Sequence, residues 1–140
     1  MKTNKEDFEE TISKCFAELF AASKEKYDSD KAERTAAMFL SAQIQLAYFI
    51  ADIELKSRYS KNDIARIEAI KYFEIKENAT GKKYTEAALE HSTAKDSEVI
   101  EAKRSNSEAE ADLKKYNYIM GSLKDGHIYF RSLSKKSWNE

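Results

Sequence analysis

The chain has 140 residues, of which 41% are hydrophobic and 35% are charged, and its formal net charge is −1 at pH 7. It contains three glycines and no proline, which makes β-sandwiches, β-barrels and glycine-rich nucleotide-binding folds unlikely and favours an all-α fold. Its one cysteine excludes an internal disulfide and fits a reducing cytoplasm. We find no stretch of about 18 uncharged apolar residues and no signal core at the acidic N-terminus, so we expect no membrane contact.

The first predicted helix begins near Thr3 or Asn4, either of which can cap it, with acidic residues in the first turn. Apolar residues recur at helical spacing along it, and Tyr27 follows near its end. The polar cluster at 28–30 is suited to end this helix and to cap the next. The apolar positions are Phe8, Ile12, Phe16, Leu19 and Phe20.

The second predicted helix runs from about Lys31 to Tyr59. One seam follows alternating steps of four and three residues, and further apolar residues lie on other faces. A helix that is apolar over much of its circumference is usually central, so we expect several neighbours around this one. The seam consists of Thr35, Phe39, Ala42, Leu46, Phe49 and Ile53, and the other apolar positions are Met38, Leu40, Ile44 and Ile50.

We expect a short break or kink at 60–62 and a third helix from about Ile64 to Asn78, followed by a loop in which Gly81 can take the positive φ that ends a helix. A short helix is predicted from Thr85 to about Glu90.

A long helix is then predicted from about Ser97 to Lys136, with a heptad-like seam. The second half of that seam carries large apolar side chains, which can join copies of the chain. The alternative is an antiparallel helix pair inside one chain. Gly121 and Gly126 lie off the seam and suggest a close contact or a kink. The seam is Val99, Ala102, Asn106, Ala109, Leu113, Tyr116, Met120, Leu123, His127 and Phe130. The candidate oligomerisation residues are Leu113, Tyr116, Met120, Leu123, Phe130 and Leu133.

No catalytic motif, metal site or cofactor site is predicted. The two histidines, His91 and His127, are far apart in sequence and have no cysteine nearby. Cys15 has no histidine or asparagine nearby to activate it, and it is expected to be a buried filler of the first helix. We therefore expect a protein that is not an enzyme and needs no cofactor.

The small net charge hides four blocks of alternating sign. Residues 56–84 carry 8 basic and 4 acidic side chains, whereas residues 1–55 carry 7 and 11, residues 85–111 carry 3 and 7, and residues 112–140 carry 6 and 3. Cations that follow phosphates and rings that stack on bases are what single-strand binding requires. The alternative is a solvated helix face with no partner. The candidate nucleic-acid-binding residues are Arg58, Lys61, Arg66, Lys71, Tyr72, Phe73, Lys76, Lys82, Lys83 and Tyr84.

Residues 60–135 resemble the UvsY-type recombination mediators of tailed phages. The resemblance rests on the Arg66-Ile67-Glu68-Ala69 region, the aromatic pair at 72–73, the basic loop before Tyr84, and the stretch from Ala94-Lys95-Asp96 to Arg131-Ser132. It implies a helical, ring-forming, non-catalytic protein that binds single-stranded DNA, a phage recombinase and a single-strand-binding protein. By the same resemblance, Arg66 and Lys71 contribute to DNA binding and Leu113 through Leu133 serve assembly.

We therefore predict one helical domain of antiparallel helices over residues 1–140, with N-terminal helices at 1–83 and a long heptad-patterned C-terminal part at 84–140 that assembles a ring-like homo-oligomer, a hexamer or heptamer. The predicted function is to load a recombinase in place of single-strand-binding protein, in the host cytoplasm if the chain is phage-encoded. The alternative is a helical adaptor, or a phage-encoded inhibitor, that uses its acidic blocks against a protein partner without nucleic acid.

Overall fold

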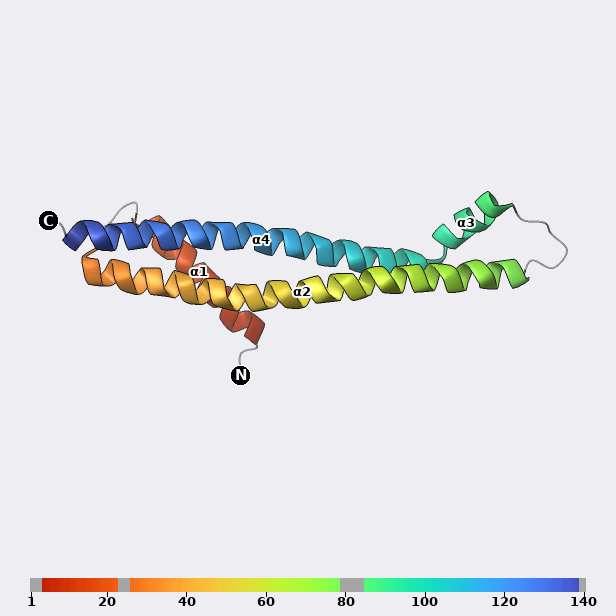
Figure 1. Cartoon of the computed structure of the whole chain (residues 1–140), viewed down its shortest axis with the longest axis horizontal. Coiled ribbons are helices and arrows are strands. Elements are labelled where there is room, and N and C mark those ends of the chain that lie inside the picture. Colours follow the sequence, from red (N-terminus) through yellow and green to blue (C-terminus); the bar gives the residue numbers. More distant parts are fainter. Residues whose placement is uncertain (1–3, 23–25, 79–84, 139–140) are drawn as a thin grey trace. The chain divides into compact units, whose positions relative to one another are not determined.

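The computed structural model of the chain describes residues 4–22, 26–78 and 85–138. These residues form four helices and no strand, which confirms the all-α prediction (Figure 1). The chain divides into two compact units, Met1–Ala51 with Lys115–Glu140 and Asp52–Lys114, so the boundaries differ from the division expected at 83–84. The helices are α1 (Asn4–Ala22), α2 (Ser29–Asn78), α3 (Glu86–Ala94) and α4 (Ser97–Trp138).

Three of the helices, α2, α3 and α4, begin where a side-chain oxygen accepts a hydrogen bond from a free backbone amide, and at the start of α4 the Asp96 carboxylate accepts one from the Glu98 amide at 2.9 Å. The Asp28 carboxylate accepts one from the Lys31 amide at 2.7 Å at the start of α2. The Thr85 hydroxyl accepts one from the Ala88 amide at 3.2 Å before α3. These polar residues therefore supply the capping that the sequence predicts at 28–30 and 85.

α2 is one continuous helix of 50 residues, so the break expected at 60–62 is wrong. Ser60 is half-buried, whereas Lys61 and Asn62 are exposed, and all three positions are helical. Serine, lysine and asparagine cost only a few tenths of a kcal/mol in a helix, far less than proline would. The surrounding contacts therefore outweigh this weak local preference for a turn.

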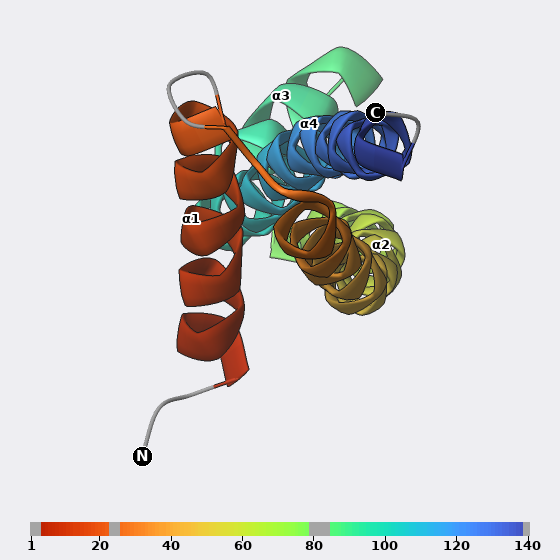
Figure 2. The same cartoon turned by 90° about the vertical axis from the view of Figure 1, so that its left-hand side faces the viewer.

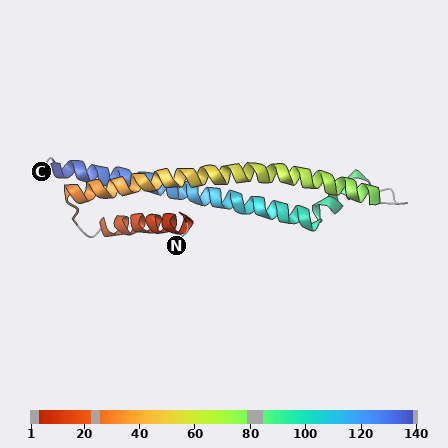
Figure 3. The same ribbon diagram turned by 90° about the horizontal axis from the view of Figure 1, so that it is seen from below.

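The first unit is built from α1, the N-terminal part of α2 and the C-terminal part of α4. Within it, these parts of α2 and α4 run antiparallel, and α1 lies beside the pair (Figures 2 and 3). Phe8 of α1 joins all three helices, because its ring stacks on Phe49 of α2 at a centroid distance of 4.6 Å and lies 6.4 Å from Tyr116 of α4. At the other end of the unit, Phe130 of α4 packs against Phe39 of α2 at 5.4 Å.

The predicted apolar seams of α2 and α4 lie inward. Thr35, Phe39, Ala42 and Leu46 are buried, and every residue of the α4 seam is buried or half-buried. Cys15 of α1 is buried too, and burial, with a contribution from Glu18, raises its pKa to about 11. A thiol with this pKa is protonated and unreactive at neutral pH, which agrees with the predicted filler role.

The large residues of the C-terminal seam form the chain's own core. Tyr116, Leu123 and Phe130 are buried in the first unit. The other three candidate oligomerisation residues, Leu113, Met120 and Leu133, are half-buried. Leu123 and Phe130 are 0% exposed, so these two side chains have no surface left for a second chain, whereas assembly through the half-buried residues stays a prediction.

One face of α2 in the first unit is exposed and apolar, although this helix contacts both α1 and α4 there. Leu40, Ile44 and Tyr48 expose 46%, 55% and 72% of their surface. By length and composition α2 carries an 18-residue window apolar enough to cross a membrane, of which only 22% is buried. The uncharged stretch in this window, residues 35–51, has 17 residues, just under the length of about 18 that the sequence analysis required of a membrane-spanning helix. Core helices of soluble proteins also pass this test.

The second unit has a thin core between α2, α3 and the N-terminal part of α4. Its buried side chains are small or medium in size, and the large aromatic residues of α2 in this unit are only half-buried or exposed. On the α4 seam, the Asn106 side-chain nitrogen donates to Glu110 at 3.3 Å, while its carbonyl oxygen is buried without a partner. The buried residues are Ser57, Leu89, Thr93 and Val99.

Candidate nucleic-acid interface

Inside the second unit, two lysines of the basic block (residues 56–84) form ion pairs with carboxylates of the acidic block (residues 85–111). Lys61 lies 3.5 Å from Glu110, and Lys71 lies 3.3 Å from Glu98. The reverse pairing also occurs, since Lys103 of α4 lies 3.1 Å from Glu68 of α2. The alternation of charge along the sequence therefore serves partly to hold α2 against α4. Exposed pairs of this kind contribute only about 0–1 kcal/mol each.

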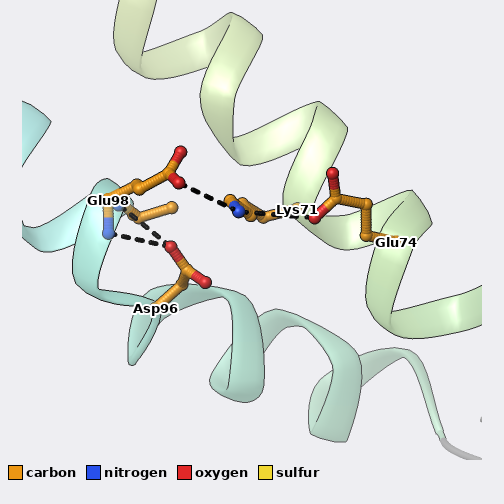
Figure 4. Close-up of polar contacts among 5 residues, drawn as sticks. Lys71, Glu74, Asp96 and Glu98 are labelled. Atoms are coloured by element: carbon orange, nitrogen blue, oxygen red, sulfur yellow. Dashed lines mark hydrogen bonds and ion pairs between the residues drawn. The ribbon is translucent and has the colours of Figure 1, made fainter. Parts of the chain in front are cut away.

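Lys71 is the most enclosed of the candidate cations. Its side chain is 18% exposed, and its ammonium group lies 3.3 Å from both Glu74 of α2 and Glu98 of α4. Figure 4 shows it reaching between these two carboxylates, beside Asp96, whose carboxylate accepts a hydrogen bond from the Glu98 amide at 2.9 Å. Hydrogen bonds to Glu74 and Glu98 raise the pKa of Lys71 above its usual value. This lysine is therefore already neutralised within the chain.

We expect Lys71→Met to destabilise the protein to urea at pH 8, because it leaves Glu98 without its cross-helix partner. A lysine with a raised folded pKa stabilises the fold fully below its unfolded pKa of about 10.5, and this contribution is lost as pH rises through the folded pKa. The difference between wild type and variant should therefore shrink above about pH 10.5. The control is the same pH series on Lys76→Met, since Lys76 has no ion pair among the described residues. A difference that stays constant with pH would contradict this role.

The outward face of α2 in the second unit combines aromatic rings with cations. Tyr59 and Phe73 expose 62% and 59% of their surface, and the Arg66 side chain between them is 64% exposed. The three residues are seven positions apart, which on a helix places them on one face at intervals of about 10 Å. We call the exposed residues on this face the outer stripe. They follow one another at steps of four and three: Leu55, Tyr59, Asn62, Arg66, Ala69, Phe73 and Lys76.

The grooves of the second unit are less suited to a phosphate. A groove of about 490 Å³ is lined by Lys56, by Tyr59 of the outer stripe and by three carboxylates, those of Asp63, Glu98 and Glu101. A second groove, lined by half-buried Tyr72 and by Ala69 of the stripe, also contains Glu68, Glu90 and Lys103. Carboxylates repel a polyanion, so Arg66, Phe73 and Lys76 of the outer stripe, which line neither groove, offer the better surface.

The structure divides the candidate residues into three groups. Arg66, Phe73 and Lys76 lie on the outer stripe with Arg58 close to it, whereas Lys61 and Lys71 pair with α4 and Tyr72 lines a groove. Lys82, Lys83 and Tyr84 lie outside the described residues. The sequence-based list omitted Tyr59, although its spacing of seven from Arg66 could have identified it.

Comparison of the chain with protein-family models, curated proteins and solved structures gave no match. Among the described residues, no group of three or more His, Cys, Asp or Glu side chains could hold a metal ion.

Proposed function

We propose that the protein is a non-catalytic mediator that binds single-stranded DNA through the outer stripe of α2. The observation that carries this proposal is the shared exposed face of Tyr59, Arg66 and Phe73. Flat rings stack on bases of any sequence, and guanidinium groups bind phosphates, so this combination suits a strand with unpaired bases. Arg66 has one weak competitor, Asp63, at 3.7 Å in an exposed pair.

In this proposal a single copy binds weakly, because few free cations face outward. Repetition of the stripe in a homo-oligomer, such as the ring that the UvsY resemblance implies, would raise the effective concentration of sites along one strand. The mediator would favour the strand conformation that a recombinase filament binds, and so help the recombinase to replace single-strand-binding protein. This is a shift of populations by differential affinity and needs no covalent chemistry.

The test is binding of a fluorescent single-stranded oligonucleotide, measured by anisotropy at several salt concentrations. We expect Tyr59→Ala and Phe73→Ala each to weaken binding by about 5- to 150-fold, because one base stack contributes about 1–3 kcal/mol. Arg66→Gln should reduce the slope of log affinity against log salt by about 0.7.

Tyr118→Ala is the matched control, because Tyr118 is 70% exposed on α4 in the first unit and lies off the stripe. Lys71→Met should change affinity less than Arg66→Gln, since Lys71 is held by Glu74 and Glu98. If the oligonucleotide does not bind at low salt, or if Tyr59→Ala, Phe73→Ala and Arg66→Gln all bind it as tightly as Tyr118→Ala does, the proposal is wrong.

The second candidate function is that of a helical adaptor or inhibitor that acts by protein–protein contact. The pairing of basic and acidic blocks within the chain favours it, because Lys61 and Lys71 are engaged by the chain's own carboxylates. Under this alternative no oligonucleotide binds at low salt, and the exposed apolar faces contact a protein instead.

A further inference from the structure

The exposed apolar face of α2 in the first unit has features that the proposed DNA site does not use. Five exposed residues, which we call the Leu40 face, follow one another at steps of three and four: Ala37, Leu40, Ile44, Ala47 and Ala51. Leu40 and Ile44 expose about half of their surface. The residues 35–51 around them carry no charge, so covering this face would bury mainly apolar area. Charged side chains lie only beside its N-terminal end, where Glu33 of α2 and Arg131 and Lys135 of α4 line a hollow with Ala37 and Leu40.

We propose that the Leu40 face binds the same face of a second copy of this chain, with the two α2 helices antiparallel. From residue 40 to residue 51 of this face, the large residues Leu40 and Ile44 come first and the alanines Ala47 and Ala51 follow, with exposed Tyr48 beside Ala47. An antiparallel pair therefore places Leu40 opposite Ala51 of the other copy, and Ile44 opposite Ala47. By the two-fold symmetry each of these two pairs occurs twice along the contact. Every opposed pair then combines one large and one small side chain, which lets the two helices approach closely and interdigitate.

A parallel pair would lack this fit, since it would stack Leu40 on Leu40 and leave alanine facing alanine. The charges at the ends of the run also favour the antiparallel arrangement. At the N-terminal end, Arg34 directly precedes the run, and Ala37 and Leu40 share a hollow with Arg131, Lys135 and one carboxylate, that of Glu33, so basic groups are in excess there; at the C-terminal end Asp52 is the first charged residue. Antiparallel helices bring these opposite charges to the same end, whereas parallel helices would bring like charges together. A two-fold contact of this kind uses the same patch on both copies and closes on itself.

Disulfide cross-linking of the full chain tests both the contact and its direction. We expect a mixture of a Leu40→Cys chain with an Ala51→Cys chain to form a linked dimer under mild oxidation. Either chain alone should not, because residue 40 then lies eleven positions, or about 16 Å, from residue 40 of the other copy. That exceeds the roughly 7 Å that a disulfide allows between Cα atoms. Cys15 is buried and present in every sample, so it serves as an internal control.

Sedimentation equilibrium tests the strength of the contact. Wild type should reach at least the mass of a dimer, and Ile44→Glu should sediment at a smaller mass with unchanged helix content, since Ile44 is 55% exposed within one chain. Tyr118→Glu, at an exposed position of α4, should keep the wild-type mass. A monomeric wild type, an Ile44→Glu variant with the wild-type mass, or cross-linking of each single-cysteine chain with itself would overturn the proposal. So would a monomer that sediments with phospholipid vesicles, because a lipid surface would then cover this face.

This inference stands apart from the proposed DNA binding. Its residues lie in the first unit, whereas those of the outer stripe lie in the second. If Phe73→Ala loses oligonucleotide binding and remains a dimer, the result supports the DNA proposal and does not test the α2 contact. If wild type is a monomer that still binds DNA, the α2 contact is wrong and the DNA proposal is unaffected.

Discussion

Replacing Phe130 with alanine is expected to lower the free energy of unfolding by about 3–5 kcal/mol, the cost of deleting a buried aromatic ring and leaving a cavity. The Phe130 side chain is 0% exposed, and its ring lies 5.4 Å from Phe39 and 5.3 Å from Tyr27. It therefore joins α4 to α2 and to the segment before α2. Urea denaturation followed by circular dichroism measures the loss.

Ile128→Ala is the matched control, because Ile128 lies two positions earlier on α4 and is 63% exposed. We expect a loss of under about 1 kcal/mol for it. The sequence alone led to a different expectation for Phe130, that it helps to join copies of the chain. A variant of Phe130 that keeps wild-type stability and only changes the oligomeric state would favour that role and contradict the packing described above.

Replacing Gly126 with alanine is expected to destabilise the protein by about 2 kcal/mol, although alanine is the better helix former. A Cβ atom at this position would lie 2.2 Å from Cε1 of Phe39, and the Phe39 ring is itself 0% exposed. The overlap should cost about 3 kcal/mol, the upper part of the usual range for overpacking, and the gain in helix propensity returns about 1 kcal/mol.

Gly121→Ala on the same helix separates these two contributions. A Cβ atom there meets nothing within 4 Å, so only the propensity gain remains and we expect stabilisation by about 1 kcal/mol. A double variant, Gly126→Ala with Phe39→Leu, should recover part of the lost stability relative to the sum of the single changes, since leucine vacates some of the space. Equal effects of the two glycine substitutions would show that no close contact exists at Gly126.

Local patterns in the sequence predicted most of the helices. The spacing of Thr35, Phe39, Ala42 and Leu46 identified the buried face of α2, and the cap residues Asp28 and Thr85 marked helix starts. These signals are local, because a helix repeats every 3.6 residues and a cap acts within one turn. The break expected at 60–62 failed since weak propensities cannot outweigh contacts made by a whole helix face.

The candidate site could be predicted only in part, because sequence patterns carry local information and do not show which side chains other helices cover. A run of cations in sequence contains residues from all sides of a helix, so Arg66 and Lys71 looked equivalent. The structure turns Arg66 outward and places Lys71 between two carboxylates, one of them on a helix that begins 26 residues later in the chain.

The amino-acid sequence by itself determined that this protein is helical, where its helices start, and which stripe of α2 and α4 avoids water. Only the tertiary structure decided which partner each stripe meets. It placed Phe130 and Leu123 in the chain's own core and left Leu40, Ile44, Tyr59 and Phe73 exposed. The physical reason is that the hydrophobic effect has no direction, so an apolar stripe requires burial without specifying the surface that provides it.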